Sequence, residues 1–370
     1  MAEIEVLDAV EGEASPAKKP GPRALSFAVP PAPIATRRRY RLATVAQVAD
    51  ELARVYREMD SVELVGVVDQ SAERAEAIAQ EFGTRTFKRI EDLQGAVDAA
   101  SVAVPTVVHA EVGCRLMALG IDVLVEKPMA ASLAEADTLL ETARRHQRIL
   151  QVGHVERFNP AVIAVEPILN RPLFFEVHRL GVFTPRSLDV EVIYDLMIHD
   201  LDILLALVKE PVTEVKAVGI PVLTDKVDIA HARIEFAGGA VANVTASRVS
   251  TERVRKMRFF QHHEYISLDY ARRDALRVGV KKPGPEPEFG FEKLAAPAVE
   301  PLRAELEAFA AAVRTRVAPK TDGVAGRAAL ELACRVMQSI REHDERVQPV
   351  AKRPDAKGPA AKSYPDKASQ

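Results

Sequence analysis

The sequence predicts a two-domain α/β protein, in which a doubly wound parallel sheet precedes an α+β domain with a large, mostly antiparallel open sheet. With 370 residues, the chain has the length of two domains of roughly 100–200 residues each, plus tails. Up to residue 153, strand-like runs alternate with amphipathic helical stretches, which is typical of βαβ units. Beyond residue 153, longer runs with period-two alternation follow one another across short turns, which indicates antiparallel pairing.

The first domain is expected over residues 37–153, with its elements in a regular order. Ser71 is suited to cap one helix, and Gly120 is suited to end another. We expect strands over 41–45, 62–69, 84–87, 98–104, 122–126 and 149–153, and helices over 52–59, 72–82, near 91, over 109–119 and over 133–145.

The second domain is expected over residues 154–345. It contains a helix near 191–207. We expect strands over 174–180, 212–219, 228–236, 240–250, 256–261 and 265–270, and two closing amphipathic helices over 301–315 and 326–342.

The two ends of the chain have the composition of tails. Six prolines fall within residues 1–36, where they break helices and central strands, and the segment runs from acidic to basic. We expect a solvated, disordered tail there, and the alternative is a docking segment for a partner or for the protein's own surface. Residues 346–370 have the same low-complexity character and are expected to be disordered as well.

Composition excludes several classes of protein. The 50 basic residues against 53 acidic ones give a net charge of -3, so no basic excess favours nucleic acid. Two cysteines build neither a disulfide framework nor a zinc ribbon, and the histidines have no partners at metal-ligand spacing, so we expect no metal site. No apolar run approaches the ~18–20 residues of a membrane span. We therefore expect a cytoplasmic protein with reduced thiols.

Ligands of doubly wound sheets bind beyond the carboxyl ends of the strands, so the residues there are candidates for a site. Asp69 ends its strand, where a carboxylate accepts hydrogen bonds from both ribose hydroxyls of NAD and repels the extra phosphate of NADP. The alternative is an aspartate that forms a turn or caps a helix. Residues 103–106 are small or proline, which lets a flat ring lie against the backbone. Lys127, held between Glu126 and Pro128 at a strand end, is positioned rather than mobile.

The predicted helix VIYDLMIHDLDILL contains the strongest pair of polar residues. Asp195 and His199 are four residues apart and so share a helix face, and Asp202 follows three residues later. Polar groups in an otherwise apolar helix are costly unless they are used or paired. The alternative is a surface pair on an amphipathic helix.

Five motifs occur in order between about residues 40 and 345: VELVGVVD…ERA, SVAVPTVVHAEV, VLVEKPMA, LQVGHVERFNP and DLMIHDLDILL. Together they resemble the Gfo/Idh/MocA family of NAD(P)-dependent sugar oxidoreductases, with a Rossmann-type first domain. The stretches VDIAHARIEF, VANVTASRVS and YISLDY are similar to the branch of UDP-N-acetylglucosamine 3-dehydrogenases, which serve lipid A precursor synthesis.

The resemblance implies hydride transfer from a sugar carbon to the nicotinamide of NAD. His199 would accept the proton of the reacting hydroxyl, as a general base. Lys127 would hydrogen-bond the developing alkoxide, and Asp195 would orient His199 or the substrate.

The resemblance also implies binding residues and an assembly. Cofactor contacts are expected from Asp69, Pro105, Thr106, His109, Glu126 and Pro128. Substrate contacts are expected from Arg157, Asn159 and Arg179, with packing as the alternative for Arg157 and Asn159. Arg179 and Arg248 could pair with a substrate diphosphate, although surface salt bridging is the default for Arg248. The partners would be a nucleotide-sugar and further copies of the chain, as a dimer or tetramer.

The match breaks at the turn after the first strand. The family has a Gly-x-Gly-x-x-Gly turn there, whereas residues 22–65 contain no glycine and residues 46–51 read AQVADE. Asp50 and Glu51 place carboxylates at a helix N-terminus, where the dipole would otherwise attract the pyrophosphate. Three explanations follow: an enzyme with an altered, weaker NAD loop, a former enzyme kept as a binding or scaffold protein, or a local difference between the recorded and the functional sequence.

Overall fold

The computed structural model describes residues 40–46, 50–184, 190–282 and 287–347. The expected tail over 1–36 lies outside these ranges, and so does the expected tail from residue 348 onward. Residues 346 and 347 are helical, which corrects the start of the second tail by two positions.

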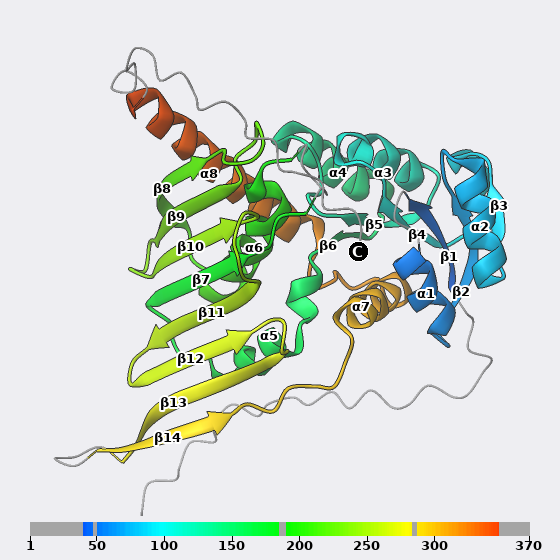
Figure 1. Ribbon diagram of the computed structural model, residues 1–370. Coiled ribbons are helices and arrows are strands. Elements are labelled where there is room, and N and C mark those ends of the chain that lie inside the picture. The colour runs from blue at the N-terminus through cyan, green and yellow to red at the C-terminus, as the bar shows by residue number, and fades with distance from the viewer. Residues whose placement is uncertain (1–39, 47–49, 185–189, 283–286, 348–370) are drawn as a thin grey trace, which may run out of the picture. The chain divides into compact units, whose positions relative to one another are not determined.

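The first sheet is parallel throughout, with the strand order β3-β2-β1-β4-β5-β6 (Figure 1). Its strands are β1 (Tyr40–Ala46), β2 (Val62–Val68), β3 (Arg85–Phe87), β4 (Ala99–Ala103), β5 (Asp122–Glu126) and β6 (Leu150–Gly153). The strand order reverses its direction between β1 and β4, and such a switch point opens a crevice at the carboxyl ends of the strands. The predicted doubly wound sheet is confirmed.

Helices connect these strands and cover the sheet. They are α1 (Asp50–Glu58), α2 (Ala72–Phe82), α3 (His109–Ala118) and α4 (Leu133–His146), with 3-10 turns at Ile90–Leu93 and Thr106–Val108. Ser71 caps α2 by accepting a hydrogen bond from the Arg74 N–H, and Gly83 ends it in the left-handed conformation, with φ +61°. The helix expected near residue 91 is only a 3-10 turn.

The second sheet has eight strands in the order β14-β13-β12-β11-β7-β10-β9-β8, and all its neighbours are antiparallel except β7 and β10. The strands are β7 (Phe174–Leu180), β8 (Val212–Ile220), β9 (Ile229–Phe236), β10 (Val241–Ser247), β11 (Val254–Gln261), β12 (Glu264–Asp269), β13 (Asp274–Lys282) and β14 (Glu288–Lys293). The last two were not expected, because β13 is rich in charged residues and β14 is an edge strand that buries only Gly290.

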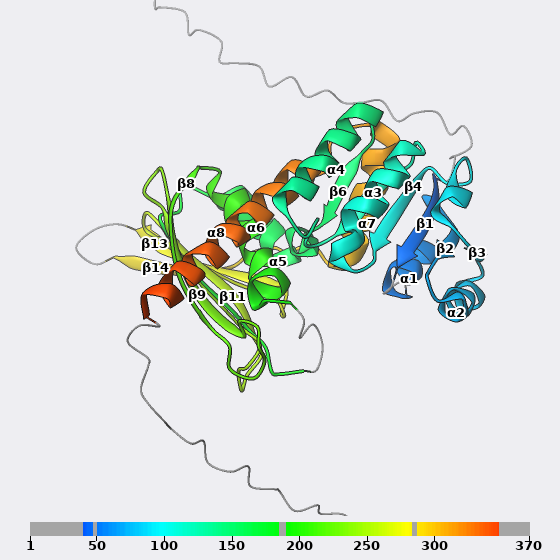
Figure 2. The ribbon, with the colours of Figure 1, turned by 90° about the horizontal axis from the view of Figure 1, so that it is seen from above.

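One face of the second sheet packs against helices (Figure 2). Alternate residues of β9 point inward, and their partners come from α5 (Pro160–Val165), α6 (Ile198–Val208) and α8 (Gly323–Val347). Short turns precede α5 and follow it, at Val155–Phe158 and Glu166–Ile168. A π-helical turn, η5 (Ile193–Met197), leads directly into α6.

The two closing helices return to the first sheet. Helix α7 (Pro301–Thr315) buries Leu306 and Phe309 in the same cluster as Leu52 and Tyr56 of α1. Helix α8 approaches β6 so closely that a Cβ at Gly326 would lie 2.4 Å from a methyl carbon of Val152. The boundary expected between residues 153 and 154 therefore does not separate the hydrophobic cores of the two sheets. Helices α7 and α8 follow this boundary in the sequence, yet both contribute side chains to the core of the first sheet.

Candidate active site

Two adjoining cavities lie at the carboxyl edge of the parallel sheet. The β2 cavity, of about 380 Å³, lies beyond β2 and is lined by Asp69, Arg74 and Pro105 among others. The β5 cavity, of about 460 Å³, lies beyond β5 and reaches Lys127. Val104 lines both cavities, so together they follow the switch point of the sheet.

Asp69 is held in a fixed orientation at the end of β2. Its carboxylate accepts a hydrogen bond from the Ser71 N–H at 2.8 Å and two from the Arg74 guanidinium, each at 2.8 Å. The turn-forming role that was the alternative for Asp69 is therefore present, and it coexists with a place on the cavity wall. The sequence analysis did not single out Arg74, which lies three residues after the Ser71 cap.

The turns beyond β4 and β5 are fastened to each other. The His109 ring lies 2.9 Å from the Pro128 carbonyl oxygen through Nδ1 and 2.8 Å from the Val104 carbonyl oxygen through Nε2. Burial lowers the pKa of His109, so the ring is neutral and donates to one of the two carbonyls at a time. His109 is 1% exposed and braces the cavity wall. Thr106 lines the β5 cavity directly.

Glu126 and Pro128 complete the turn around Lys127. The Lys127–Pro128 peptide bond is cis. The Glu126 carboxylate faces β6, where a Cβ at Gly153 would lie 2.8 Å from its Oε2, so a larger residue at position 153 would displace this carboxylate. Burial raises the pKa of Glu126, while the neighbouring Lys127 opposes the rise. Both Glu126 and Pro128 line the β5 cavity.

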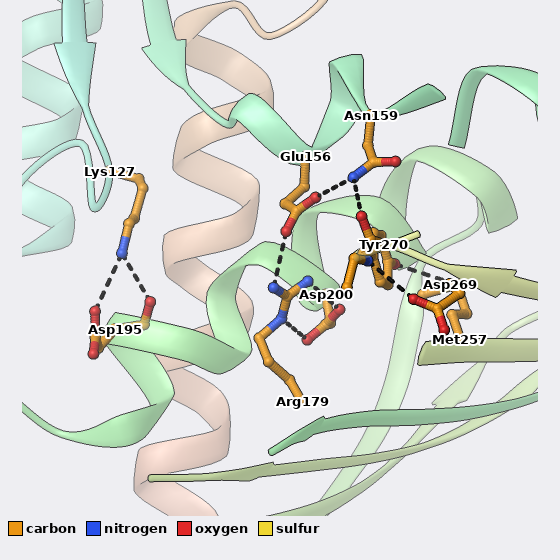
Figure 3. A network of polar contacts seen from close by, with 10 residues as sticks. Lys127, Glu156, Asn159, Arg179, Asp195, Asp200, Met257, Asp269 and Tyr270 are labelled. Carbon is orange, nitrogen blue, oxygen red and sulfur yellow. Dashed lines mark hydrogen bonds and ion pairs between the residues drawn. The ribbon is translucent and has the colours of Figure 1, made fainter. Parts of the chain in front are cut away.

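Lys127 reaches across from the first sheet to η5 (Figure 3). Its Nζ donates to the main-chain oxygen of Asp195 at 2.8 Å and lies 3.4 Å from the Asp195 Oδ1. The side chains of Lys127 and Asp195 are 19% and 27% exposed, so the ion pair borders the cavity instead of lying in the core. The sequence analysis named both residues for the site but did not predict that they contact each other.

His199 follows four residues after Asp195, on α6. Its Nδ1 is shielded from solvent and has no hydrogen-bond partner in the part of the chain that the structure describes. Burial lowers the pKa of His199 well below its usual range, and the positive charges of Lys127 and Arg179 add to this effect. The imidazole is therefore neutral at physiological pH, which is the form that accepts a proton.

Among the described residues, Asp195 contacts Lys127 and makes no hydrogen bond with His199, while its expected role of orienting the substrate stays a prediction. The expectation of a contact with His199 assumed α-helical spacing, but Asp195 lies in the π-helical turn, where the Ile198 N–H donates to the Ile193 carbonyl five residues back. The wider turn changes the angle between positions 195 and 199. Such π-helical turns are frequent at functional sites.

Arg179 and Asn159 belong to a buried network (Figure 3). Arg179 donates to both oxygens of Asp200, at 2.7 and 2.9 Å, and to Glu156 at 3.0 Å. Asn159 donates to Glu156 at 2.9 Å and to the Tyr270 carbonyl at 3.1 Å. Since the Arg179 side chain is only 4% exposed, its donors are used inside the protein.

Arg157 is also used internally. Its Nη1 lies 3.3 Å from the Asp202 Oδ1, and its side chain is 11% exposed. The packing alternative for Arg157 and Asn159 therefore agrees with the contacts. For Arg179, two carboxylates bind the guanidinium within the protein, and its expected role toward a substrate stays a prediction.

The turn after β1 lies partly outside the described residues, which omit 47–49. Its neighbours are clear: β1 ends at Ala46, and α1 begins at Asp50. Asp50 and Glu51 occupy the first turn of α1, as expected. Glu51 also lines the β5 cavity, together with Leu302 of α7 and Tyr194 of η5, which the sequence analysis did not identify.

Two family models match the chain. A model described as an oxidoreductase family with an NAD-binding Rossmann fold matches residues 45–154, and a GFO/IDH/MocA C-terminal domain matches residues 175–263. A UDP-N-acetylglucosamine 3-dehydrogenase of Acidithiobacillus ferrooxidans is 38% identical over 284 residues, which cover 75% of this chain and 90% of that relative. A scyllo-inositol 2-dehydrogenase (NAD(+)) of Bacillus subtilis is 29% identical over 50% of this chain and 60% of that relative.

Solved structures agree with these matches. The UDP-N-acetylglucosamine 3-dehydrogenase GnnA from Acidithiobacillus ferrooxidans is similar with a TM-score of 0.77 and 34% identity, over 82% of this chain and 98% of that one. A levoglucosan dehydrogenase in complex with NADH and levoglucosan has a TM-score of 0.73 at 18% identity, over 82% of this chain and 98% of that one. At this identity the second likeness concerns the fold alone.

The buried network leads to a prediction about stability. Replacing Arg179 by methionine leaves Asp200 and Glu156 without their cation, which we expect to lower the free energy of unfolding by about 3–5 kcal/mol in urea titrations at pH 7. Burial already raises the pKa of Asp200. The folded variant therefore takes up a proton before the unfolded chain does, and the loss shrinks as the pH falls to 5.

The matched control is Arg258→Met, which removes only the surface ion pair with Glu176 at 3.7 Å. We expect about 0–1 kcal/mol for this control. Equal losses for the Arg179 and Arg258 variants would contradict a structural role of Arg179.

Proposed function

The chain belongs to the Gfo/Idh/MocA family of NAD-binding oxidoreductases, and from this premise we propose that it oxidises a hydroxyl carbon of a nucleotide-sugar with NAD. The observation that carries the proposal is the ammonium group of Lys127, which is fixed on Asp195 at the wall of the β5 cavity. A neutral imidazole, His199, lies in the same electrostatic environment. A cation and a neutral base at one carbon are what the oxidation of an alcohol requires.

The adjoining cavities fit a dinucleotide. Their shared wall at Val104 joins the end of β2, where Asp69 lies, to the end of β5, where Lys127 lies. Asp69 and Pro105 would hold the adenosine end, and Thr106, Glu126 and Pro128 would surround the nicotinamide end. When bound, nicotinamide supplies the acceptor for a hydride from the sugar carbon.

The side chains of the protein have separate roles in the reaction. His199 accepts the proton of the sugar hydroxyl and becomes an imidazolium. Lys127 donates a hydrogen bond to the oxygen on which negative charge develops, and so stabilises the alkoxide character of the transition state. Asp195 holds the Lys127 ammonium toward that oxygen with two acceptor atoms.

Support for a nucleotide-sugar comes from the UDP-N-acetylglucosamine 3-dehydrogenase of Acidithiobacillus ferrooxidans, which matches most of both chains. UDP-N-acetylglucosamine is therefore the first substrate to assay, and a place in lipid A precursor synthesis follows from that resemblance.

The preference for NAD over NADP follows from the carboxylate of Asp69, which repels a 2′-phosphate. The assembly into a homo-oligomer and the cytoplasmic location stay predictions. No described helix combines the length and apolarity needed to cross a membrane.

We expect His199→Ala to lower kcat with NAD and UDP-N-acetylglucosamine by ~10²–10⁴-fold, because the general base is lost. The Kd of NADH, measured by calorimetry, should stay within about twofold. The base must be neutral, and its pKa lies well below the usual value. The acid limb of kcat/KM in the unmodified protein should therefore fall below pH ~6.5.

The control is His231→Ala, which removes an exposed histidine of β9 and should leave both kcat and the pH profile unchanged. An acid limb centred above pH ~6.5, or full turnover in the His199 variant, would exclude His199 as the base.

Cofactor preference gives a second prediction. Asp69→Ser removes the carboxylate that repels a 2′-phosphate, and it releases the Arg74 guanidinium toward the β2 cavity. We expect the ratio of kcat/KM for NADP over NAD to rise at least tenfold. Asp137→Ser, which removes an exposed carboxylate of α4 paired with Arg327, is the control and should leave the ratio unchanged. An unaltered ratio in the Asp69 variant would mean that Asp69 does not select the cofactor.

A further inference from the structure

A third cavity, which we call the arginine cavity, lies where β7, β10 and β11 reach η5. It has a volume of about 130 Å³ and is lined by Arg179, Leu180, Gly181, Val182, Thr184, Asp195, Leu196, Arg248, Arg253 and Arg255. Asp195 lines both this cavity and the β5 cavity. The arginine cavity therefore begins at the residue that holds the Lys127 ammonium.

The sheet register places two positive charges directly opposite each other. Arg255 of β11 pairs with Arg179 of β7 across the antiparallel ladder. Side chains two residues apart on a strand point to the same face of the sheet, so Arg255 shares a face with Met257 and Phe259. Both of these residues are buried, and helices cover this face. Like charges at directly opposite positions are destabilising unless something compensates them.

Only one member of this pair is compensated within the protein. Arg179 is bound by Asp200 and Glu156, whereas Arg255 has no hydrogen bond or ion pair with any residue that the structure describes. Partial burial lowers the pKa of Arg255, and the charges of Arg179 and Arg253 lower it further, while the more distant carboxylates of Glu156 and Asp200 oppose the shift without bonding to it. Both Arg253 and Arg255 are exposed to solvent and so are accessible to a ligand.

Arg253 is the second cation of the cavity without an acidic partner in the described part of the chain. It lies one residue before β11 begins and lines the same cavity as Arg255. Arg248 differs, since its Nε lies 3.7 Å from the Asp228 Oδ1 and it also donates to the Val190 carbonyl. Arg253 and Arg255 thus contribute two positive charges that form no ion pair with any carboxylate in the described ranges.

We propose that Arg253 and Arg255 bind the diphosphate of the nucleotide-sugar, a proposal that rests on the proposed function. A diphosphate diester carries two negative charges at neutral pH, which match the two uncompensated guanidinium groups. The planar fork of arginine suits phosphate oxygens. The cavity is large enough for the diphosphate alone, so the sugar extends past Asp195 into the β5 cavity and the nucleoside extends outward. This assignment replaces the earlier expectation for Arg179 and Arg248.

The test is calorimetric binding of UDP to the full chain, with and without saturating NADH, so that binding in the dinucleotide cavities is excluded. We expect Arg255→Ala and Arg253→Ala to raise the Kd of UDP at least tenfold, and Arg255→Lys to restore part of the affinity. The KM of UDP-N-acetylglucosamine should rise in parallel, while the Kd of NADH stays unchanged.

Arg258→Ala is the matched control. Arg258 lies on the same strand, but its side chain points to the opposite face of the sheet, where it pairs with Glu176. It should bind UDP like the unmodified chain, and thermal unfolding should show that all variants are folded. Unchanged UDP affinity in Arg255→Ala, or binding of NADH but not of UDP by the unmodified chain, would overturn the diphosphate site. If the chain binds NADH but not UDP, the proposed dehydrogenase activity would remain, with a sugar that carries no nucleotide as the substrate. Arginine-dependent UDP binding without NADH binding would support the diphosphate site and reject the proposed function.

Discussion

The contact between the Lys127 ammonium and Asp195 joins the parallel sheet to the antiparallel one at the point where the cavities meet. Lys127 follows β5, and Asp195 lies in the π-helical turn before α6, so neither sheet alone provides the pair. The two cores must therefore hold a fixed relation for the ammonium group to face a reacting oxygen. The Asp195 main-chain oxygen and carboxylate define that position with two acceptors.

The surrounding structure maintains this relation through shared helices and buried charge. Helix α8 packs against β6 of the first sheet and against α6 and β8 of the second. Helix α7 closes the core that contains α1. Below η5, the ion pairs of Arg179 with Asp200 and Glu156 connect β7 to α6 and to the turn after β6. Replacing a member of such a network leaves a buried charge, so these residues are structurally constrained.

Much of the architecture followed from periodicity, and the site followed only in part. The six parallel strands and the carboxyl-end positions of Asp69 and Lys127 were predictable, because βαβ alternation fixes which strand ends meet. The spacing of residues in the sequence could not distinguish the roles of Arg179 and Arg255. Arg179 forms ion pairs within the protein, whereas Arg255 forms none with the described residues. That difference depends on the cross-strand register and on Asp200, which are tertiary facts. Likewise, the π-helical turn that directs Asp195 to Lys127 has no signature in the amphipathic pattern.

We propose that the cavities along the sheet edge bind a dinucleotide although residues 46–51, which follow β1, contain no glycine. Glu51 places a carboxylate on the wall of the β5 cavity, which weakens the attraction of the α1 N-terminus for phosphate. The most direct measurement is calorimetric titration of NADH into the full chain, beside the Glu51→Gln variant. We predict a Kd in the micromolar range that becomes lower in the variant. No binding at millimolar NADH in either protein would contradict the claim.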